Sequence, residues 1–123
     1  MTFSSHDHDV EQAAEALRCR AQQKLVARQT LAKSTREALI EVVRVLRDDF
    51  DVRSVFVFGS LATGSFTEES DVDLAIEGLG ESRTYQAERC VLSILQVPVD
   101  LLRFEELDPR FAEAIRAEGE RLL

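Results

Sequence analysis

The sequence predicts a mixed α+β protein, with a small mixed β-sheet flanked by helices and preceded by an N-terminal helical extension. Three observations predict this class. Apolar residues recur at helical spacing through residues 10–50. Short, dense apolar runs follow at 55–58, 71–76 and 97–102, and their length suits strands. One helix-period segment separates the second run from the third, and another follows the third.

Composition and charge narrow the classes of function. The 123 residues are 45% hydrophobic and 31% charged, with a formal net charge of −8, which suits one globular domain. The negative charge argues against direct nucleic-acid binding, which depends on Lys and Arg neutralising phosphates. No apolar run approaches the roughly 20 residues of a membrane span, and the first residues lack a secretory pattern, so we expect a cytoplasmic protein without membrane contact. Two kinds of partner are compatible with the negative charge. One is a nucleotide bound through divalent cations, and the other is a basic protein surface.

The first helical segment is expected to span residues 10–50. A stripe of Ala and Leu at 13–25 is followed by a more apolar stripe at 39–50, which we expect to pack on the core. Ser34 or Thr35, followed closely by a glutamate, resembles a helix-capping signal and indicates a division into two helices. The earlier stripe suits either simple packing or a docking surface.

Residues 1–9 are expected to form a flexible terminus. His6 and His8 alternate there with two aspartates, which is also compatible with a small metal site, but a polar, frayed terminus is the simpler interpretation.

Residues 51–123 are expected to form the domain that carries the chemistry. The run 55–58 is predicted as a buried strand because it is short, β-branched and stopped by Gly59. The later elements are expected to be a strand at 71–76, a helix at 83–95, a strand at 97–102, a helix from Asp108–Pro109 to Gly119 and a short strand at 121–123. The helix after Pro109 is expected to bury Phe111, Ala114 and Ile115.

The strand at 55–58 ends in Gly59-Ser60, a candidate phosphate-binding turn. Glycine permits close approach of the backbone to a ligand, and a helix starting at Ser60 would direct free N–H groups at an anion. The Ser60 hydroxyl adds a further donor. Taken alone, such a pair is more often an ordinary turn.

Three aspartates supply the second part of the candidate site. Asp71 and Asp73 lie two residues apart, so both carboxylates project from one face of a strand. Asp100 interrupts an apolar run, where an unpaired charge is costly. If the third strand lies beside the second, the three carboxylates converge and can hold two divalent ions, and Asp100 can accept a proton from an attacking hydroxyl. The alternatives are an aspartate that caps the loop, and an exposed edge position for Asp100.

Together these residues resemble the signature of the DNA polymerase β-type nucleotidyltransferase superfamily. Gly59-Ser60, ten intervening residues and then Asp71-Val72-Asp73 match its motif, and Asp100 stands where its third acid is carried. Residues 52–123 are most similar to the minimal nucleotidyltransferases, and 107–122 also resemble the ending of that group. One departure is Thr63, where many members carry a basic residue.

The resemblance implies a reaction and a set of roles. A hydroxyl attacks the α-phosphorus of a nucleoside triphosphate, expected to be ATP, and pyrophosphate leaves. Asp71, Asp73 and Asp100 are the implied catalytic residues and ligands of Mg²⁺, with two ions expected. The residues implied in nucleotide binding are Gly59, Ser60, Thr63, Gly64 and Ser70.

The family also implies a partner. Minimal nucleotidyltransferases are typically paired with HEPN-domain ribonuclease toxins, and some act as antitoxins by adenylylating a toxin tyrosine. We therefore expect a HEPN-domain toxin as partner. The alternatives are an antitoxin that neutralises its partner by binding alone, a homodimeric enzyme acting on a small molecule such as an aminoglycoside, and a chance motif in a structural domain.

Overall fold

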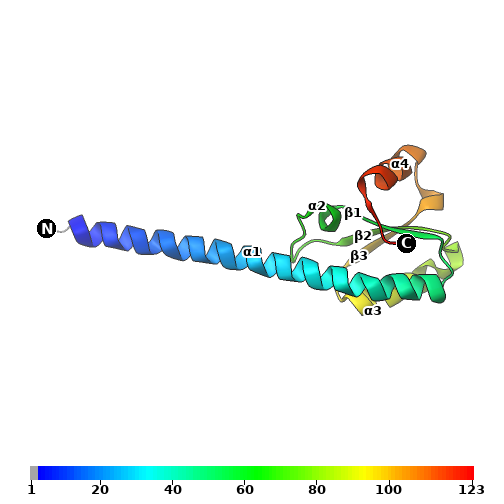
Figure 1. Cartoon of the computed structure of the whole chain (residues 1–123), viewed down its shortest axis with the longest axis horizontal. Helices are drawn as coiled ribbons and strands as arrows, with labels where there is room; N and C mark the ends of the chain where they lie inside the picture. The colour runs from blue at the N-terminus through cyan, green and yellow to red at the C-terminus, as the bar shows by residue number, and fades with distance from the viewer. Residues whose placement is uncertain (1–2) are drawn as a thin grey trace.

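The protein folds around a four-stranded sheet with helices on both faces (Figure 1). The computed structural model describes the backbone of residues 3–123 and the side chains from Val10 onward. Its elements are, in chain order, α1 (Phe3–Asp48), β1 (Ser54–Phe58), α2 (Ser60–Thr63), β2 (Val72–Glu77), η1 (Glu81–Arg83), α3 (Thr84–Leu95), β3 (Val99–Arg103), η2 (Phe104–Glu106), α4 (Pro109–Glu118) and β4 (Glu120–Arg121). The predicted α+β class is confirmed.

The strand order is β3-β2-β1-β4. β1 pairs antiparallel with both β2 and β4, whereas β2 and β3 run parallel. Such a parallel pair needs a crossover connection, and α3 provides it. This crossover sets β3 beside β2, which is the arrangement needed for Asp100 to approach Asp71 and Asp73.

One long helix replaces the two predicted between residues 10 and 50. α1 continues unbroken through Ser34 and Thr35. The Ser34 hydroxyl donates to the carbonyl oxygen of Leu31 (3.0 Å), and Thr35 is buried at 4% exposure. Because one hydroxyl is bonded within the helix and the other residue faces the core, neither starts a new helix.

The main core lies between the sheet and the pair α1 and α3. Alternate residues of the strands point to this side, including Val57 on β1 and Leu74 on β2. The α1 residues that meet them are Leu39, Val42 and Leu46, each at most 3% exposed. The predicted packing of the 39–50 stripe is confirmed, and it makes the C-terminal part of α1 integral to the domain.

The other face of the sheet carries a smaller core beneath α4. Phe56 and Ala75 of the sheet pack there against Phe104, Ala112 and Ile115. The predicted burial of Ile115 is confirmed, but that of Phe111 and Ala114 is wrong, because both are exposed. The helix starts where predicted, with the Asp108 carboxylate accepting from the Arg110 N–H (2.8 Å), but its buried side passes through Ala112 and Ile115 instead.

The strand boundaries differ from the prediction by one or two residues. β2 ends at Glu77, because the φ of +92° at Gly78 breaks the strand conformation. β3 begins after Pro98, and the Pro98 carbonyl accepts a hydrogen bond from the Val72 N–H (2.9 Å). The final strand is Glu120–Arg121, and Leu122 continues alongside β1 by donating its N–H to the Val55 carbonyl (2.8 Å).

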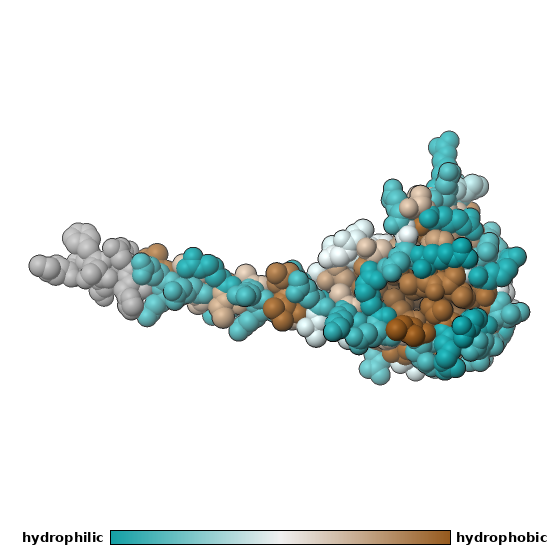
Figure 2. Space-filling view, viewed as in Figure 1, coloured by the Kyte–Doolittle hydropathy of each residue, from teal (hydrophilic) through white to brown (hydrophobic). Residues whose placement is uncertain are grey.

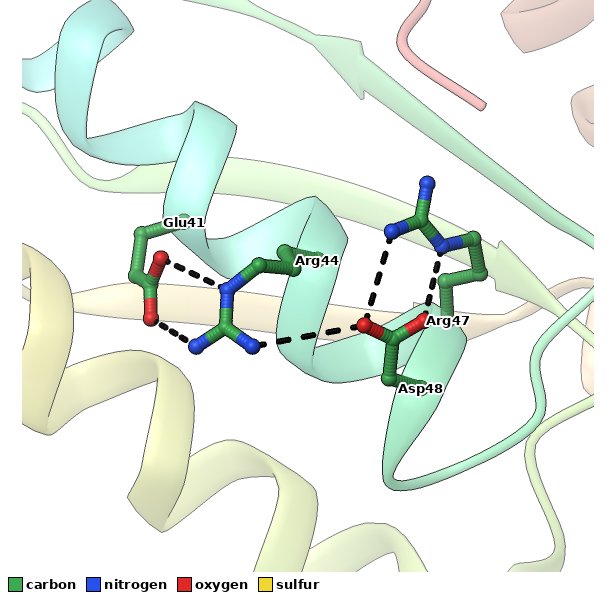
Figure 3. Close-up of polar contacts among 4 residues, drawn as sticks. All are labelled: Glu41, Arg44, Arg47 and Asp48. Atoms are coloured by element: carbon green, nitrogen blue, oxygen red, sulfur yellow. Dashed lines mark hydrogen bonds and ion pairs between the residues drawn. The ribbon is translucent and has the colours of Figure 1, made fainter.

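The solvent face of α1 near its end carries a run of charged pairs (Figure 3). Arg44 lies between Glu41 and Asp48, with its Nε 2.9 Å from a Glu41 carboxylate oxygen, and Arg47 contacts Asp48 at the same distance. These hydrogen bonds lower the pKa of both carboxyls. All four side chains are exposed, so we expect only a small contribution to stability.

The N-terminal residues and the membrane-spanning potential of the helices were also the subject of predictions. Of the stretch 1–9 that was predicted to be flexible, residues 3–9 form the start of α1, and residues 1 and 2 lie outside the described residues. The alternative metal site at His6 and His8 rests on side chains that also lie outside the described residues. Among the described helices, none combines the length and the apolar content needed to cross a bilayer, and α1 is long but too polar.

The core position of α1 is tested by a matched pair of truncations on this helix. Leu46 is fully buried and Ile40 is 74% exposed. Leu46→Ala is expected to lower the free energy of unfolding by about 3 kcal/mol, because it removes contacts and leaves a cavity. Ile40→Ala should change it by less than about 0.5 kcal/mol. Urea denaturation measures both, and equal losses would contradict the packing described.

Candidate active site

Gly59 lies directly against the carboxylate of Asp73. Its φ of +72° and ψ of −148° belong to a region that essentially only glycine occupies. A Cβ at this position would fall 2.2 Å from Asp73 Oδ2. The position therefore requires glycine twice, once for the backbone conformation and once for the space that the carboxylate fills.

The sheet topology brings Asp71, Asp73 and Asp100 together. Asp73 is the register partner of Asp100 in the parallel pair β2–β3, and neighbouring strands lie about 4.8 Å apart. Asp71 precedes β2 and is two residues from Asp73, so it belongs to the same face. This is the α4 face, because Ala75, next in the series, packs beneath α4.

The charges in this cluster repel one another. Partial burial raises the pKa of Asp73, and the neighbouring charges of Asp100 and Asp71 raise that pKa further. Among the described residues, none of the three carboxylates forms a hydrogen bond or an ion pair with a basic side chain. The protein thus concentrates negative charge here without supplying its own counter-charge, which favours a cation as ligand.

The donor set fits magnesium held jointly with a substrate. Within the described part of the chain, no group of three or more His, Cys, Asp or Glu side chains is arranged to hold a metal ion alone. Mg²⁺ is bound in many proteins by one or two carboxylates, with phosphate and water oxygens completing six ligands. The aspartates therefore suit a magnesium–nucleotide complex better than a metal cage built from protein alone.

Ser60 stands beside this cluster as the first residue of α2. The turn is closed by the Thr63 N–H, which donates to the Gly59 carbonyl (3.1 Å), and by the Ser65 N–H, which donates to the Ser60 carbonyl (3.0 Å). The first N–H groups of a helix have no partner within it. Together with the Ser60 hydroxyl, these donors are available to a phosphate next to the acids.

Three further residues were predicted to bind nucleotide, namely Thr63, Gly64 and Ser70, and their neighbours differ from those of Gly59 and Ser60. The Ser70 hydroxyl accepts from the Thr67 N–H (3.0 Å) and so holds the turn that leads into Asp71. The hydroxyls of Thr63 and Ser65 lie 3.0 Å apart at the far end of α2. Gly64 borders a cavity of about 760 Å³ between α1 and residues 64–67, which none of the three aspartates lines. We place the candidate site at the carboxylates, because their charge and the adjacent Gly59 turn supply the chemistry that this cavity lacks.

An aromatic pair beside the carboxylates was not predicted. Phe58 is the cross-strand partner of Asp73, and its ring meets that of Phe111 edge to face at 6.0 Å between centroids. Phe111 remains 44% exposed. The helical period of α4 had predicted Phe111 as a core residue. That prediction failed because the sequence does not reveal which strand residues α4 will cover.

The close approach of Gly59 to Asp73 generates a first prediction for the site. In Gly59→Ala, the new methyl group meets the carboxylate and displaces it, so binding of magnesium–ATP is expected to fall at least tenfold. Gly80→Ala is the control, because Gly80 has ordinary backbone angles and open space around it. Titration calorimetry measures both variants. Unchanged binding by Gly59→Ala would contradict the fit of the backbone to Asp73.

The raised pKa of Asp73 predicts how stability depends on pH. A carboxyl whose pKa is higher in the folded state is more costly to ionise there, so its ionisation destabilises the fold above that pKa. Asp73→Asn is therefore expected to raise the melting temperature at pH 7 without metal. The gain should disappear as the pH falls below 3.8, the ordinary pKa of an aspartate, because the carboxyl is then protonated in both the folded and the unfolded wild type. Asp49→Asn, at an exposed position, is the control, and a lower melting temperature for Asp73→Asn would oppose this account.

The chain is similar in sequence to a known protein family and to a named relative. The sequence model of the family described as "Polymerase beta, Nucleotidyltransferase" matches residues 41–123. A protein of Methanocaldococcus jannaschii, named provisionally as a protein adenylyltransferase, is 43% identical over 42 residues. That match covers 34% of this chain and 42% of the relative, so the chain matches less than half of the relative's length.

Two solved structures are similar in fold. One, described provisionally as a minimal nucleotidyltransferase, has a TM-score of 0.63 and 28% identity, covering 72% of this chain and 92% of that one. The other is a chain from the complex of a tri-AMPylated Shewanella oneidensis HEPN toxin with its MNT antitoxin. Its TM-score is 0.57 at 18% identity, covering 72% of this chain and 71% of that one, so it supports the fold alone.

The family match extends over two thirds of the chain and includes the glycine–serine turn, all three aspartates and every strand of the described sheet. The chain belongs to the polymerase β-type nucleotidyltransferase family.

Proposed function

We propose that this nucleotidyltransferase transfers AMP from ATP to a tyrosine hydroxyl of a HEPN-domain toxin and thereby acts as its antitoxin. The observation that carries the proposal is the convergence of Asp71, Asp73 and Asp100 beside the Gly59–Ser60 turn. The relative named as a protein adenylyltransferase and the fold shared with an antitoxin of an AMPylated HEPN toxin support this choice of reaction and partner.

The reaction assigned to the site is an in-line displacement at phosphorus. The acceptor hydroxyl oxygen forms a bond to the α-phosphorus, the bond from that phosphorus to the bridging oxygen breaks, and pyrophosphate leaves. Asp100 is exposed near the start of β3 and accepts the hydroxyl proton. Bound Mg²⁺ supplies neutralisation of the phosphate charge and orientation of the reacting oxygens.

The remaining residues act by positioning. Gly59 and Ser60 hold the triphosphate through backbone N–H groups and a hydroxyl, while Asp71 and Asp73 hold the metal. Fixing the reactants in this way accounts for much of the rate in phosphoryl-type transfer.

The aromatic pair next to the acids supports an aromatic acceptor. Phe111 exposes part of its ring and packs edge to face on Phe58, which is the cross-strand neighbour of Asp73. A tyrosine ring can rest against such a surface with its hydroxyl directed at the carboxylates. The net charge of −8 likewise favours a basic protein partner over a nucleic acid.

Transfer is tested with ATP labelled at the α or the γ phosphate, in the presence of Mg²⁺ and a purified HEPN-domain partner. The partner is expected to acquire label from α-labelled ATP only. Asp73→Asn should reduce this transfer at least about 100-fold, because it removes a charged metal ligand. Asp49→Asn replaces an aspartate remote from the cluster and should retain wild-type transfer.

Each contrary outcome identifies another function. Label from γ-labelled ATP alone would mean kinase chemistry. A stable, unlabelled complex with a neutralised toxin would mean an antitoxin that works by binding. Transfer to an aminoglycoside without any protein partner would mean a small-molecule enzyme.

A further inference from the structure

The N-terminal part of α1 projects beyond the globular domain (Figure 1). Contact with the domain begins near Arg28, which lies 3.8 Å from Glu68, and Leu31 and Ala32 are the first residues of α1 to pack against the core. Residues 10–30 are exposed apart from the half-buried Ala14. At 1.5 Å per residue, the segment 3–30 is about 40 Å long. Helices of this kind depend on packing for most of their stability in water.

The projecting segment continues the apolar stripe that the domain buries. With 3.6 residues per turn, Val10, Leu17 and Ala21 lie within about 30° of the line midway between the buried residues Leu39 and Leu46. Leu17 is 64% exposed, and Val10 and Leu25 are each more than half exposed. Figure 2 shows brown apolar groups between teal polar ones along this part of the helix. A shallow hollow on it is bordered by Leu17, Ala21 and Lys24.

Charge on the same segment is divided into two blocks. Residues 1–17 contain no Lys or Arg but four acidic side chains, namely Asp7, Asp9, Glu11 and Glu15. Residues 18–36 contain basic but no acidic side chains, namely Arg18, Arg20, Lys24, Arg28, Lys33 and Arg36. A helix divided in this way is complementary to a second copy that runs in the opposite direction, because each acidic block then faces a basic block.

We infer that α1 pairs with α1 of a second copy of this chain in an antiparallel homodimer. If the pair is centred between Leu17 and Arg18, Val10 lies level with Leu25 of the second copy and Ala14 with Ala21. The same alignment sets Glu11 level with Lys24 and Glu15 with Arg20. A parallel pair would instead place like charges side by side along the whole helix, which is unfavourable.

The antiparallel arrangement is also compatible with the rest of the molecule. The domain lies at one end of α1 (Figure 1), so the two domains of the dimer lie at opposite ends of the helix pair. The Gly59–Asp73 site faces away from α1 across the sheet, and both copies therefore leave it accessible. Dimerisation is independent of nucleotidyl transfer and is measured without ATP or a partner.

Sedimentation equilibrium of the full chain tests the pairing. The wild type is expected to have twice the mass of one chain. Leu17→Glu places a charge at the centre of the stripe in both copies and should raise the dissociation constant at least about 100-fold. Val26→Glu adds the same charge about 180° away from Leu17 around the helix and should leave the dimer intact. A monomeric wild type, or equal weakening by both variants, would overturn the proposal. Retained cooperative unfolding of the domain shows that each variant is folded.

Disulfide formation tests the orientation. In a Cys19→Ser, Cys90→Ala background, a mixture of Ala14→Cys and Ala21→Cys chains should crosslink, because these positions are level only in the antiparallel pair. Ala14→Cys alone should not, because its two copies stand about 10 Å apart along the axis. Efficient crosslinking of Ala14→Cys alone would indicate a parallel pair and overturn the proposal.

Discussion

The parallel pairing of β2 with β3 sets Asp73 and Asp100 in register, and much of the architecture exists to hold this unfavourable juxtaposition of charges. The free energy needed to bring like charges together is supplied on the opposite side of the sheet, where Val72 and Leu74 pack against α1 and α3. The acids and the core alternate along the same strand. The packing on the α1 and α3 side of the sheet thus holds the three carboxylates close together on the other side. A cation bound there would relieve their mutual repulsion.

The backbone makes a second contribution at the end of β1. Gly59 approaches Asp73 so closely that no side chain fits between them, and α2 begins at the next residue. The donors of a helix start and the acceptors of the acid cluster are thereby adjacent. A magnesium–triphosphate complex matches both sets of groups. Its phosphate oxygens accept from the N–H groups, and its cation is bound by the carboxylates.

α1 is buried along one part of its length and exposed along the other. Its C-terminal part supplies the core, with Val42 and Leu46 fully buried, whereas its N-terminal part leaves the same stripe uncovered. The continuity of the stripe supports the proposed interface on the exposed part of the helix. The division of charge along it then distinguishes between the orientations available to a second helix.

Most of this protein was predictable from local pattern. The dense run ending at Gly59 specified β1, the Asp71–Asp73 spacing specified a shared face, and Asp108–Pro109 specified the start of α4, because each depends on near neighbours in the chain. The family followed from the same residues. Local pattern failed at Ser34 and Thr35, where tertiary packing overrides a capping signal, and at Phe111, whose exposure depends on how α4 is seated over β1. Only the tertiary structure decided that β3 lies in register with β2, that Gly59 contacts Asp73, and which part of α1 is covered. These are contacts between residues far apart in sequence, and the free energy that selects them comes from the packing of the whole core.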